Sequence, residues 1–246
     1  MPERPEDVEV ERTRSFLLPH LGSARRILDV GCGNGLLARS LAEAGRDVTA
    51  LDRSLKRTEK TDGIRFVESD FLLFEDAPYD VLVFSASLHH LFPLDGALDA
   101  AARLLRPGGV LLASDFDLEA PDLATARWYY DVEGLLVAAG LYRPDKVGAS
   151  DVENPLARWH AEHLHSPPFH SGAAMREGVE RFFTETRTST GPYLYRYVVG
   201  GLEATPKGTE LALWALATEE RHLQEGSLKP VGMRFVARKA AEKLRR

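Results

Sequence analysis

Residues 28–35 read Leu-Asp-Val-Gly-Cys-Gly-Asn-Gly, and this stretch decides the fold. The apolar run at 26–30 has the pattern of a short strand, and Leu37, Leu41 and Ala44 share one face of a helix that follows. The closely spaced glycines leave the backbone of the intervening turn uncovered, so a ligand can approach it. Glycine-rich turns also occur without a ligand, so this interpretation needs support from the rest of the chain.

Short apolar runs alternate with segments of helical period from residue 26 to about residue 116. This alternation is typical of a parallel sheet covered by helices. The predicted strands of this region are 26–30, 47–51, 64–68, 81–85 and 110–114.

Composition limits the partners of the chain. Its 246 residues include 31 Lys and Arg against 37 Asp and Glu, a formal net charge of −6, so we expect neither nucleic acid nor a membrane as a partner. No apolar run approaches the roughly 18 residues that a bilayer-spanning helix needs. Cys32 is the one cysteine, and the acidic opening lacks the pattern of a signal peptide. We therefore expect a soluble, cytoplasmic protein.

Further motifs follow the glycine-rich turn in a fixed order. Asp52 ends the second predicted strand, 52 − 31 = 21 residues after the first glycine, where a carboxylate can accept hydrogen bonds from both hydroxyls of a ribose. Segment 79–91 reads YDVLVFSASLHHL and segment 104–109 reads LLRPGG. In residues and in order, these motifs resemble the class I S-adenosylmethionine-dependent methyltransferases. The resemblance covers roughly residues 20 to 118.

The resemblance implies S-adenosylmethionine as the cofactor and assigns a part of it to each motif. In the family, the glycine turn accommodates the methionine and ribose portions, and the acidic residue in the position of Asp52 holds the ribose. Asp70 is then expected beside the adenine amine, with Phe71 covering the ring. The predicted cofactor-binding residues are Asp29, Gly31, Cys32, Gly33, Asn34, Gly35, Asp52, Arg53, Asp70, Phe71 and Ser85.

The pattern changes after residue 116. Helices are predicted at 121–140, 156–164 and 173–183, and strand character returns at 193–199 and 233–238 around a helix at 207–224. We therefore predict an α/β fold, Rossmann-like and doubly wound, with a mostly parallel seven-stranded sheet and a helical cap inserted between strands five and six. The predicted domains are a cofactor-binding core at 1–118, an acceptor-binding cap at 119–183, and a segment at 184–246 that completes the core.

Two histidines follow the fourth predicted strand. In open α/β sheets the carboxyl ends of the strands face the ligand crevice, so His89 and His90 are placed near the cofactor. Methyl transfer from a sulfonium is an in-line displacement, and a protonated oxygen or nitrogen acceptor gains from a base. We therefore predict His89 and His90 as catalytic residues. The alternative is that they only cap a helix or pack the loop.

The predicted cap contributes histidines and aromatic residues. Segment 159–165 reads Trp-His-Ala-Glu-His-Leu-His, and His163 is the third predicted catalytic residue. The His-Glu-x-x-His spacing of zinc hydrolases is absent, so a polar helix is favoured over a metal site and no metal is predicted. The tyrosines at 193, 195 and 197 are predicted to share one strand face, which lines a pocket or packs in the core. The predicted substrate-binding residues are Trp128, Tyr129, His165 and Tyr195.

The preferred function is methylation of an oxygen or nitrogen on a small-molecule acceptor, and a homodimer is compatible with it. A DNA amino-methyltransferase is disfavoured, because residues 85–88 read Ser-Ala-Ser-Leu and not Asp/Asn-Pro-Pro-Tyr/Phe. An RNA or protein methyltransferase is an alternative, as is a non-catalytic protein that binds S-adenosylmethionine or S-adenosylhomocysteine. A dehydrogenase is the third alternative.

Overall fold

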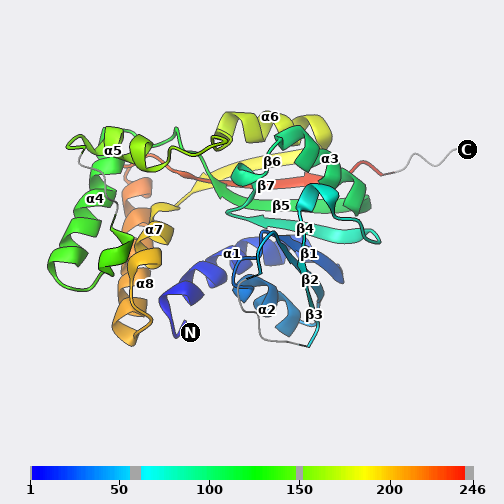
Figure 1. Ribbon diagram of the computed structural model, residues 1–246, viewed down its shortest axis with the longest axis horizontal. Helices are drawn as coiled ribbons and strands as arrows, with labels where there is room; N and C mark the ends of the chain where they lie inside the picture. The colour runs from blue at the N-terminus through cyan, green and yellow to red at the C-terminus, as the bar shows by residue number, and fades with distance from the viewer. Residues whose placement is uncertain (1, 56–61, 148–151, 242–246) are drawn as a thin grey trace, which may run out of the picture. The chain divides into compact units, whose positions relative to one another are not determined.

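A seven-stranded sheet with the order β3-β2-β1-β4-β5-β7-β6 forms the centre of the fold (Figure 1). It is seen in a computed structural model, which describes residues 2–55, 62–147 and 152–241. The strands are β1 (Arg26–Val30), β2 (Asp47–Asp52), β3 (Ile64–Glu68), β4 (Tyr79–Ser85), β5 (Leu105–Phe116), β6 (Thr184–Gly191) and β7 (Gly232–Arg238).

Most of the sheet is parallel. β1 pairs in parallel with β2 and β4, and the parallel pairing continues to β3 and β5. β7 runs antiparallel to β5. The start of β5 lies beside the end of β7, where the Gly108 N–H donates to the Lys239 carbonyl over 3.1 Å. The predicted α/β fold with a mostly parallel, seven-stranded sheet is confirmed.

Helices form most of the connections between the strands. The described residues form α1 (Pro5–Leu21), α2 (Leu36–Glu43), α3 (Leu94–Leu104), α4 (Leu123–Ala138), α5 (Pro155–Glu162), α6 (Gly172–Phe182), α7 (Leu194–Gly201) and α8 (Pro206–Gln224). Three short 3-10 helices are η1 (Phe71–Leu73), η2 (Leu88–His90) and η3 (Pro144–Lys146). Among the described residues, no helix combines the length and the apolar character that a membrane span requires.

The helical insertion between strands five and six is confirmed, since α4, α5 and α6 lie between β5 and β6 in the chain. The position of the sixth strand was predicted wrongly. It is β6, with the sequence Thr-Glu-Thr-Arg-Thr-Ser-Thr-Gly, and not residues 193–199. β6 is an edge strand without a large apolar side chain, so its sequence lacks the hydrophobic alternation by which strands are recognised.

Residues 193–199 belong mainly to helix α7, so the predicted strand face of three tyrosines is wrong. The buried side chains of Leu194, Tyr195, Val198 and Val199 have helical spacing. Tyr193 and Tyr197 lie four residues apart, with ring centroids at 5.9 Å. The first N–H groups of α7 are satisfied by a buried side chain from α8, Glu219, which a local reading of the sequence cannot reveal.

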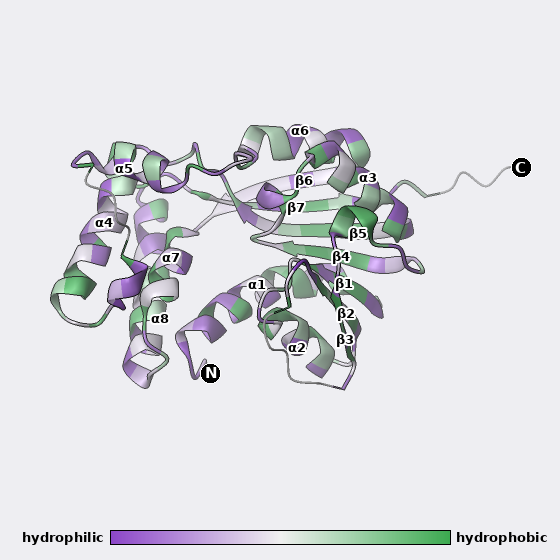
Figure 2. Ribbon diagram, viewed as in Figure 1, coloured by the Kyte–Doolittle hydropathy of each residue, from purple (hydrophilic) through white to green (hydrophobic). Residues whose placement is uncertain are grey.

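The core of the sheet is apolar. Four of the five residues of β1 are buried, as are Val81, Leu82, Val83 and Phe84 of β4. Figure 2 shows β4 and β5 largely in the hydrophobic colour. Each such side chain stabilises the fold by about 1.5–3 kcal/mol relative to exposure, which fixes the central strands and therefore the loops at their ends.

The chain packs into two compact units. We call Arg12–Asp115, Ala173–Ser189 and Arg234–Arg246 the sheet unit, and Met1–Glu11, Phe116–Gly172 and Thr190–Met233 the helical unit. In the sheet unit α6 lies against α3, since a Cβ at Gly178 would be 2.6 Å from the Leu98 side chain. In the helical unit α4 packs on α5, and α7 on α8. The predicted domain boundaries and the cap role of 119–183 remain predictions.

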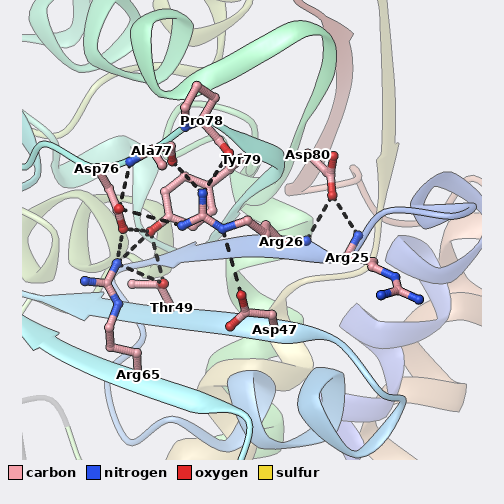
Figure 3. Close-up of polar contacts among 10 residues, drawn as sticks. All are labelled: Arg25, Arg26, Asp47, Thr49, Arg65, Asp76, Ala77, Pro78, Tyr79 and Asp80. Atoms are coloured by element: carbon pink, nitrogen blue, oxygen red, sulfur yellow. Dashed lines mark hydrogen bonds and ion pairs between the residues drawn. The ribbon is translucent and has the colours of Figure 1, made fainter.

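Polar side chains and backbone carbonyls gather where the parallel strands begin, and we call this group the amino-edge cluster (Figure 3). The Tyr79 hydroxyl donates to Asp76 Oδ2 over 2.5 Å, and the Arg65 guanidinium also binds Asp76. Arg26 donates to the carbonyls of Ala77 and Pro78, each over 3.0 Å. These groups are satisfied by one another, so the amino edge is tied together internally. The cluster consists of Arg25, Arg26, Asp47, Thr49, Arg65, Asp76, Ala77, Pro78, Tyr79 and Asp80.

Candidate cofactor site

A pocket of about 250 Å³ lies at the carboxyl ends of β1, β2 and β4 in the sheet unit. The strand order reverses between β1 and β4, and open α/β sheets bind ligands at such a switch point. The volume lies just below the range of about 300–1,000 Å³ that is typical of small-molecule sites. The pocket is lined by Val30, Gly31, Leu51, Asp52, Arg53, Ser69, Phe71, Ala86, Ser87, His90 and Leu91.

The glycine-rich turn forms one wall of the pocket. Gly31 has a φ of 75°, and a Cβ there would lie 2.6 Å from Cβ of Ser87. Gly35 has a φ of 74°, and a Cβ there would meet the Phe66 ring at 2.8 Å. Both positions therefore require glycine for backbone conformation and for space. Gly31 is exposed, so its backbone is open to a ligand.

Asp52 joins this turn to the end of β2. Its Oδ2 accepts a hydrogen bond from the Gly33 N–H over 2.9 Å, and its Oδ1 accepts one from the Ser54 N–H over 3.1 Å. The side chain is half-buried and lines the pocket. These bonds stabilise the carboxylate and fix its position beside the glycines.

Asp29 lies just before the turn and is only 1% exposed. Its Oδ2 is buried and has no hydrogen-bond partner among the residues that the structure describes. Burial, and secondarily the charge of Asp52, raises the pKa of Asp29 to about 7. Burial raises the pKa of the Cys32 thiol to about 12, with Asp29 and Asp52 adding to the shift, so Cys32 is not a thiolate at neutral pH.

The helix η1, which follows β3, contributes Phe71, whose buried ring lines the pocket and meets the Phe84 ring edge to face at 5.6 Å. Asp70 is not among the lining residues. Its Oδ1 accepts the Leu72 N–H over 2.9 Å, which caps η1, and its Oδ2 is 3.7 Å from the Arg53 guanidinium. Asp70 therefore orients the segment that carries Phe71.

The loop after β4 closes the pocket on another side. The Ser87 hydroxyl donates to the Val30 carbonyl over 2.6 Å, and the Ala86 N–H donates to the Ser114 carbonyl over 2.8 Å. Ala86 has a φ of 52°, which is strained for a residue with a side chain. The loop is therefore anchored to β1 and β5 despite its unfavourable conformation.

The two histidines of this loop have different environments. His90 is exposed and lines the pocket. His89 is 4% exposed, and its Nδ1 is 2.6 Å from Oδ1 of Asp115 at the end of β5. The two imidazole rings have their centroids 4.0 Å apart. Of the two histidines, His90 is therefore the one that can touch a ligand in this pocket, and His89 is buried.

Sequence reasoning found part of the lining. Gly31, Asp52, Arg53 and Phe71 were predicted for the cofactor and line the pocket, while the remaining predicted cofactor residues lie outside the lining. Ser85 is the last residue of β4 and pairs with Ser114. The lining residues that were missed lie near or after the carboxyl end of a strand, and that position was the available signal. They are Val30, Leu51, Ser69, Ala86, Ser87 and Leu91.

His163 lies in the helical unit at the C-cap of α5. Its Nδ1 is 2.7 Å from the Trp159 carbonyl, so Nδ1 carries the proton, and Nε2 accepts from the Tyr197 hydroxyl over 2.8 Å. Burial lowers the pKa of His163. Rings surround this pair, and we call the group the aromatic cluster: Phe116, Tyr129, Trp159, His163, Tyr193 and Tyr197.

The predicted substrate-binding residues occupy several places in the helical unit. Tyr129 belongs to the aromatic cluster, with its ring 5.8 Å from that of Tyr197. His165 is exposed and stacks on Phe169 at 3.9 Å. Tyr195 is 2% exposed, and the Trp128 ring lies 6.0 Å from that of His222 on α8. Tyr129 and His163 are brought together in one cluster, which the sequence could not indicate.

A partly buried charge network joins α4 to α5. Arg158 donates to Glu133 over 3.0 Å and to Glu162 over 2.8 Å, and the Tyr130 hydroxyl donates to Glu162 over 2.7 Å. These pairs satisfy Glu133, which is 3% exposed. Within residues 2–55, 62–147 and 152–241, no group of three His, Cys, Asp or Glu side chains is arranged to hold a metal ion.

The sheet order and the glycine turn define a Rossmann-like fold of the class I methyltransferase type. A methyltransferase domain family model matches residues 3–180, and the chain belongs to this family. The ubiquinone biosynthesis O-methyltransferase of Xylella fastidiosa (strain 9a5c) is 38% identical over 104 residues, which are 37% of this chain and 42% of that protein. The chain thus matches less than half the length of this curated relative.

Solved structures share the fold. An S-adenosylmethionine-dependent methyltransferase from Archaeoglobus fulgidus has a TM-score of 0.57 at 16% identity, covering 95% of this chain and 94% of that one. The 1,6-didemethyltoxoflavin-N1-methyltransferase of Burkholderia thailandensis, solved with 1,6-didemethyltoxoflavin and S-adenosylhomocysteine, has a TM-score of 0.54 at 18% identity, covering 94% and 78%. At these identities the likeness establishes the fold.

Proposed function

We propose that this chain transfers the methyl group of S-adenosylmethionine to an oxygen or nitrogen atom of a small-molecule acceptor. The observation that carries the proposal is the pocket at the switch point, where the exposed backbone of Gly31 adjoins the carboxylate of Asp52. Membership of the methyltransferase domain family supports the reaction type.

The residues present fit the cofactor. Gly31 offers uncovered backbone, Asp52 offers carboxylate oxygens for ribose hydroxyls, and Phe71 offers an apolar ring for adenine. When bound, S-adenosylmethionine supplies a methyl group on a sulfonium, a good leaving group for in-line displacement. The protein's task is then to orient the acceptor and to exclude water. The other predicted cofactor residues support this wall by fixing the turn and the strand ends.

We assign proton removal from the acceptor to His90. It is the exposed imidazole on the pocket wall, and imidazole suits a general base near neutral pH. His89 is buried against Asp115 and holds the loop that presents His90. The third predicted catalytic residue, His163, belongs to the aromatic cluster and is proposed as an acceptor contact.

Acceptor recognition is assigned to the segment 119–183 and to α7. The aromatic cluster combines apolar rings with the polar groups of His163 and Tyr197, a combination that suits a flat, partly apolar acceptor. Tyr129 is the predicted residue with the strongest support, since it belongs to this cluster. Trp128, His165 and Tyr195 remain further candidates. The O-methyltransferase relative favours an oxygen acceptor.

The proposal is tested with methyl-labelled S-adenosylmethionine and a panel of catechols, phenols, and primary and secondary amines. Label is expected in the phenolic products. His90→Ala should lower the rate by about 10²-fold or more while affinity for S-adenosylhomocysteine is retained. His20→Ala is the matched control, because this α1 histidine packs on Phe16 and does not line the pocket.

Two results would contradict the proposal in different ways. A folded protein that binds neither S-adenosylmethionine nor S-adenosylhomocysteine, but binds NAD, is a dehydrogenase-type protein. Tight binding without transfer to any member of the panel, or to RNA and protein added separately, identifies a cofactor-binding protein without methyltransferase activity.

A further inference from the structure

Helix α8 exposes the largest apolar side chain that it carries. Trp214 is 46% exposed, and its neighbour Leu213 is 45% exposed. A helix on the surface of a monomer normally turns its large apolar side chains toward the core. For Leu213 and Trp214 this arrangement is reversed, so a partner on the outer face of α8 would remove both from water. The fully buried residues of the same helix are small or polar: Gly208, Thr209, Ala212, Ala215, Thr218 and Glu219.

Six exposed residues form one stripe along the whole of α8, which we call the outer stripe. They are spaced alternately by three and four residues, and this spacing places them on one face of a helix. The stripe has an apolar centre and polar ends, which is the usual layout of a protein interface. Its members are Lys207, Glu210, Trp214, Ala217, Arg221 and Gln224.

The outer stripe is complementary to itself when two copies of α8 lie antiparallel. The point midway between Glu210 and Arg221 is also midway between Trp214 and Ala217. A twofold axis through that point places each Glu210 opposite the partner's Arg221, and each Trp214 opposite the partner's Ala217. A carboxylate then meets a guanidinium, and the indole ring meets the smallest side chain of the stripe.

Charge distinguishes this arrangement from a parallel one. In a parallel pair of α8 helices, Glu210 would face a second Glu210 and Arg221 a second Arg221, and like charges opposite one another disfavour an interface. The existing contact of Glu210 does not compete strongly. Its Oε2 is 2.9 Å from Nζ of Lys207, but both side chains are mostly exposed, and exposed ion pairs contribute little.

We propose that the outer stripe of α8 is the interface of a homodimer, in which two α8 helices pack antiparallel across a twofold axis. Trp214 is the central residue, because a tryptophan that is buried at the centre of an interface contributes strongly to binding. One pair of helices is a small interface, so the dimer should be weak, with a dissociation constant on the order of 10 μM. The inference concerns assembly and does not depend on the proposed function.

The first test is sedimentation equilibrium of the whole chain from about 1 to about 200 μM, a range that brackets the expected dissociation constant. The native chain should pass from monomer to dimer, and Trp214→Ala should raise the dissociation constant by more than about tenfold. Leu73→Ala is the matched control, because Leu73 is 79% exposed and lies outside α8, and it should leave the constant within about twofold. A native chain that stays monomeric throughout overturns the inference, as does a dimer that Trp214→Ala leaves intact.

Exchange of charges tests the antiparallel register. Glu210→Arg and Arg221→Glu each place like charges opposite one another, so each variant alone should dimerise at least about tenfold more weakly than the native chain. An equimolar mixture of the two variants restores both opposite-charge pairs and should dimerise with nearly native affinity. Arg103→Glu, an exposed charge reversal on α3, is the control and should dimerise as the native chain does. A mixture that associates no better than its components contradicts the antiparallel pairing. Circular dichroism checks that both variants are folded.

Discussion

Asp115 binds His89 at two points, through the ring and through the backbone. Oδ1 of Asp115 lies 2.6 Å from Nδ1 of His89, and its Oδ2 accepts the His89 N–H over 3.2 Å. A carboxylate can only accept, so the proton of the neutral imidazole is on Nδ1. Asp115 is fully buried, and the pair fixes the short helix η2 that carries His90 to the pocket.

Asp115→Asn should weaken this arrangement. The amide offers one acceptor oxygen, so one of the two donors of His89 faces an NH₂ group, at a cost of about 1–3 kcal/mol. Urea unfolding measures the loss, and ¹⁵N chemical shifts of the His89 ring report the tautomer. A native tautomer together with native stability would show that Asp115 does not position His89.

Gly31→Ala should disrupt the proposed cofactor pocket. A Cβ at this position would be 2.6 Å from Ser87 Cβ, so the turn or the loop after β4 must shift. We expect affinity for S-adenosylhomocysteine to fall by more than about tenfold, measured by calorimetry. Gly45→Ala is the control, because Gly45 has a φ of 77° but no described atom within 4 Å of its added Cβ. Equal affinities for the two variants would remove the contact with Ser87 as the cause.

Local sequence patterns predicted the elements that build the pocket, because the strands in question are buried and apolar. The predicted strand at 26–30 coincides with β1, and the glycine turn follows it as expected. The same rule failed at β6, whose polar edge residues carry no such pattern. It failed again at Tyr193–Tyr197, where the helix depends on Glu219 from a distant element.

Within the site, the types of the residues could be predicted from the sequence, but the direction in which each side chain points could not. His89 and His90 are adjacent and identical, and only the fold shows that one binds Asp115 and the other lines the pocket. Asp115 itself ends the apolar run of β5 and has no local motif. Its role depends on the register between β4 and β5, which is a tertiary property.

Tyr79→Phe should destabilise the sheet without affecting the pocket. The Tyr79 hydroxyl donates to Asp76, accepts from Arg65 over 3.1 Å, and is buried at the amino edge (Figure 3). Its removal leaves these partners incompletely bonded, so we expect a loss of about 1–2 kcal/mol in urea unfolding. Affinity for S-adenosylhomocysteine should stay within about twofold, because the proposed cofactor site lies at the opposite ends of the strands. A large loss of affinity would contradict this separation.

Glu219→Gln should weaken the start of α7. The carboxylate accepts N–H bonds from Tyr193 over 2.7 Å, Leu194 over 3.0 Å and Tyr195 over 2.8 Å. A glutamine places an NH₂ group against one of these donors, so unfolding should become easier by about 1–3 kcal/mol. The control is Glu210→Gln, an exposed pair with Lys207 whose loss should change stability by less than about 1 kcal/mol. Equal losses of stability in both variants would contradict the role of Glu219 at the start of α7.

Asp29→Asn should change how stability depends on pH. Burial raises the pKa of Asp29 from 3.8 to about 7, so between these values the folded state holds a proton that the unfolded state has lost. The free energy of unfolding therefore falls as pH rises from about 4 to about 7, and this contribution is constant above that. Asparagine has no proton to lose, so the variant should match the native chain near pH 4 and exceed its stability at pH 8 by on the order of 2 kcal/mol.

Burial also raises the pKa of Glu219 to about 7, but this group is present in both proteins and its effect cancels in the difference. Urea unfolding of the cofactor-free proteins at pH 4, 6 and 8 measures that difference, and a constant value across the three would show that Asp29 is ionised throughout.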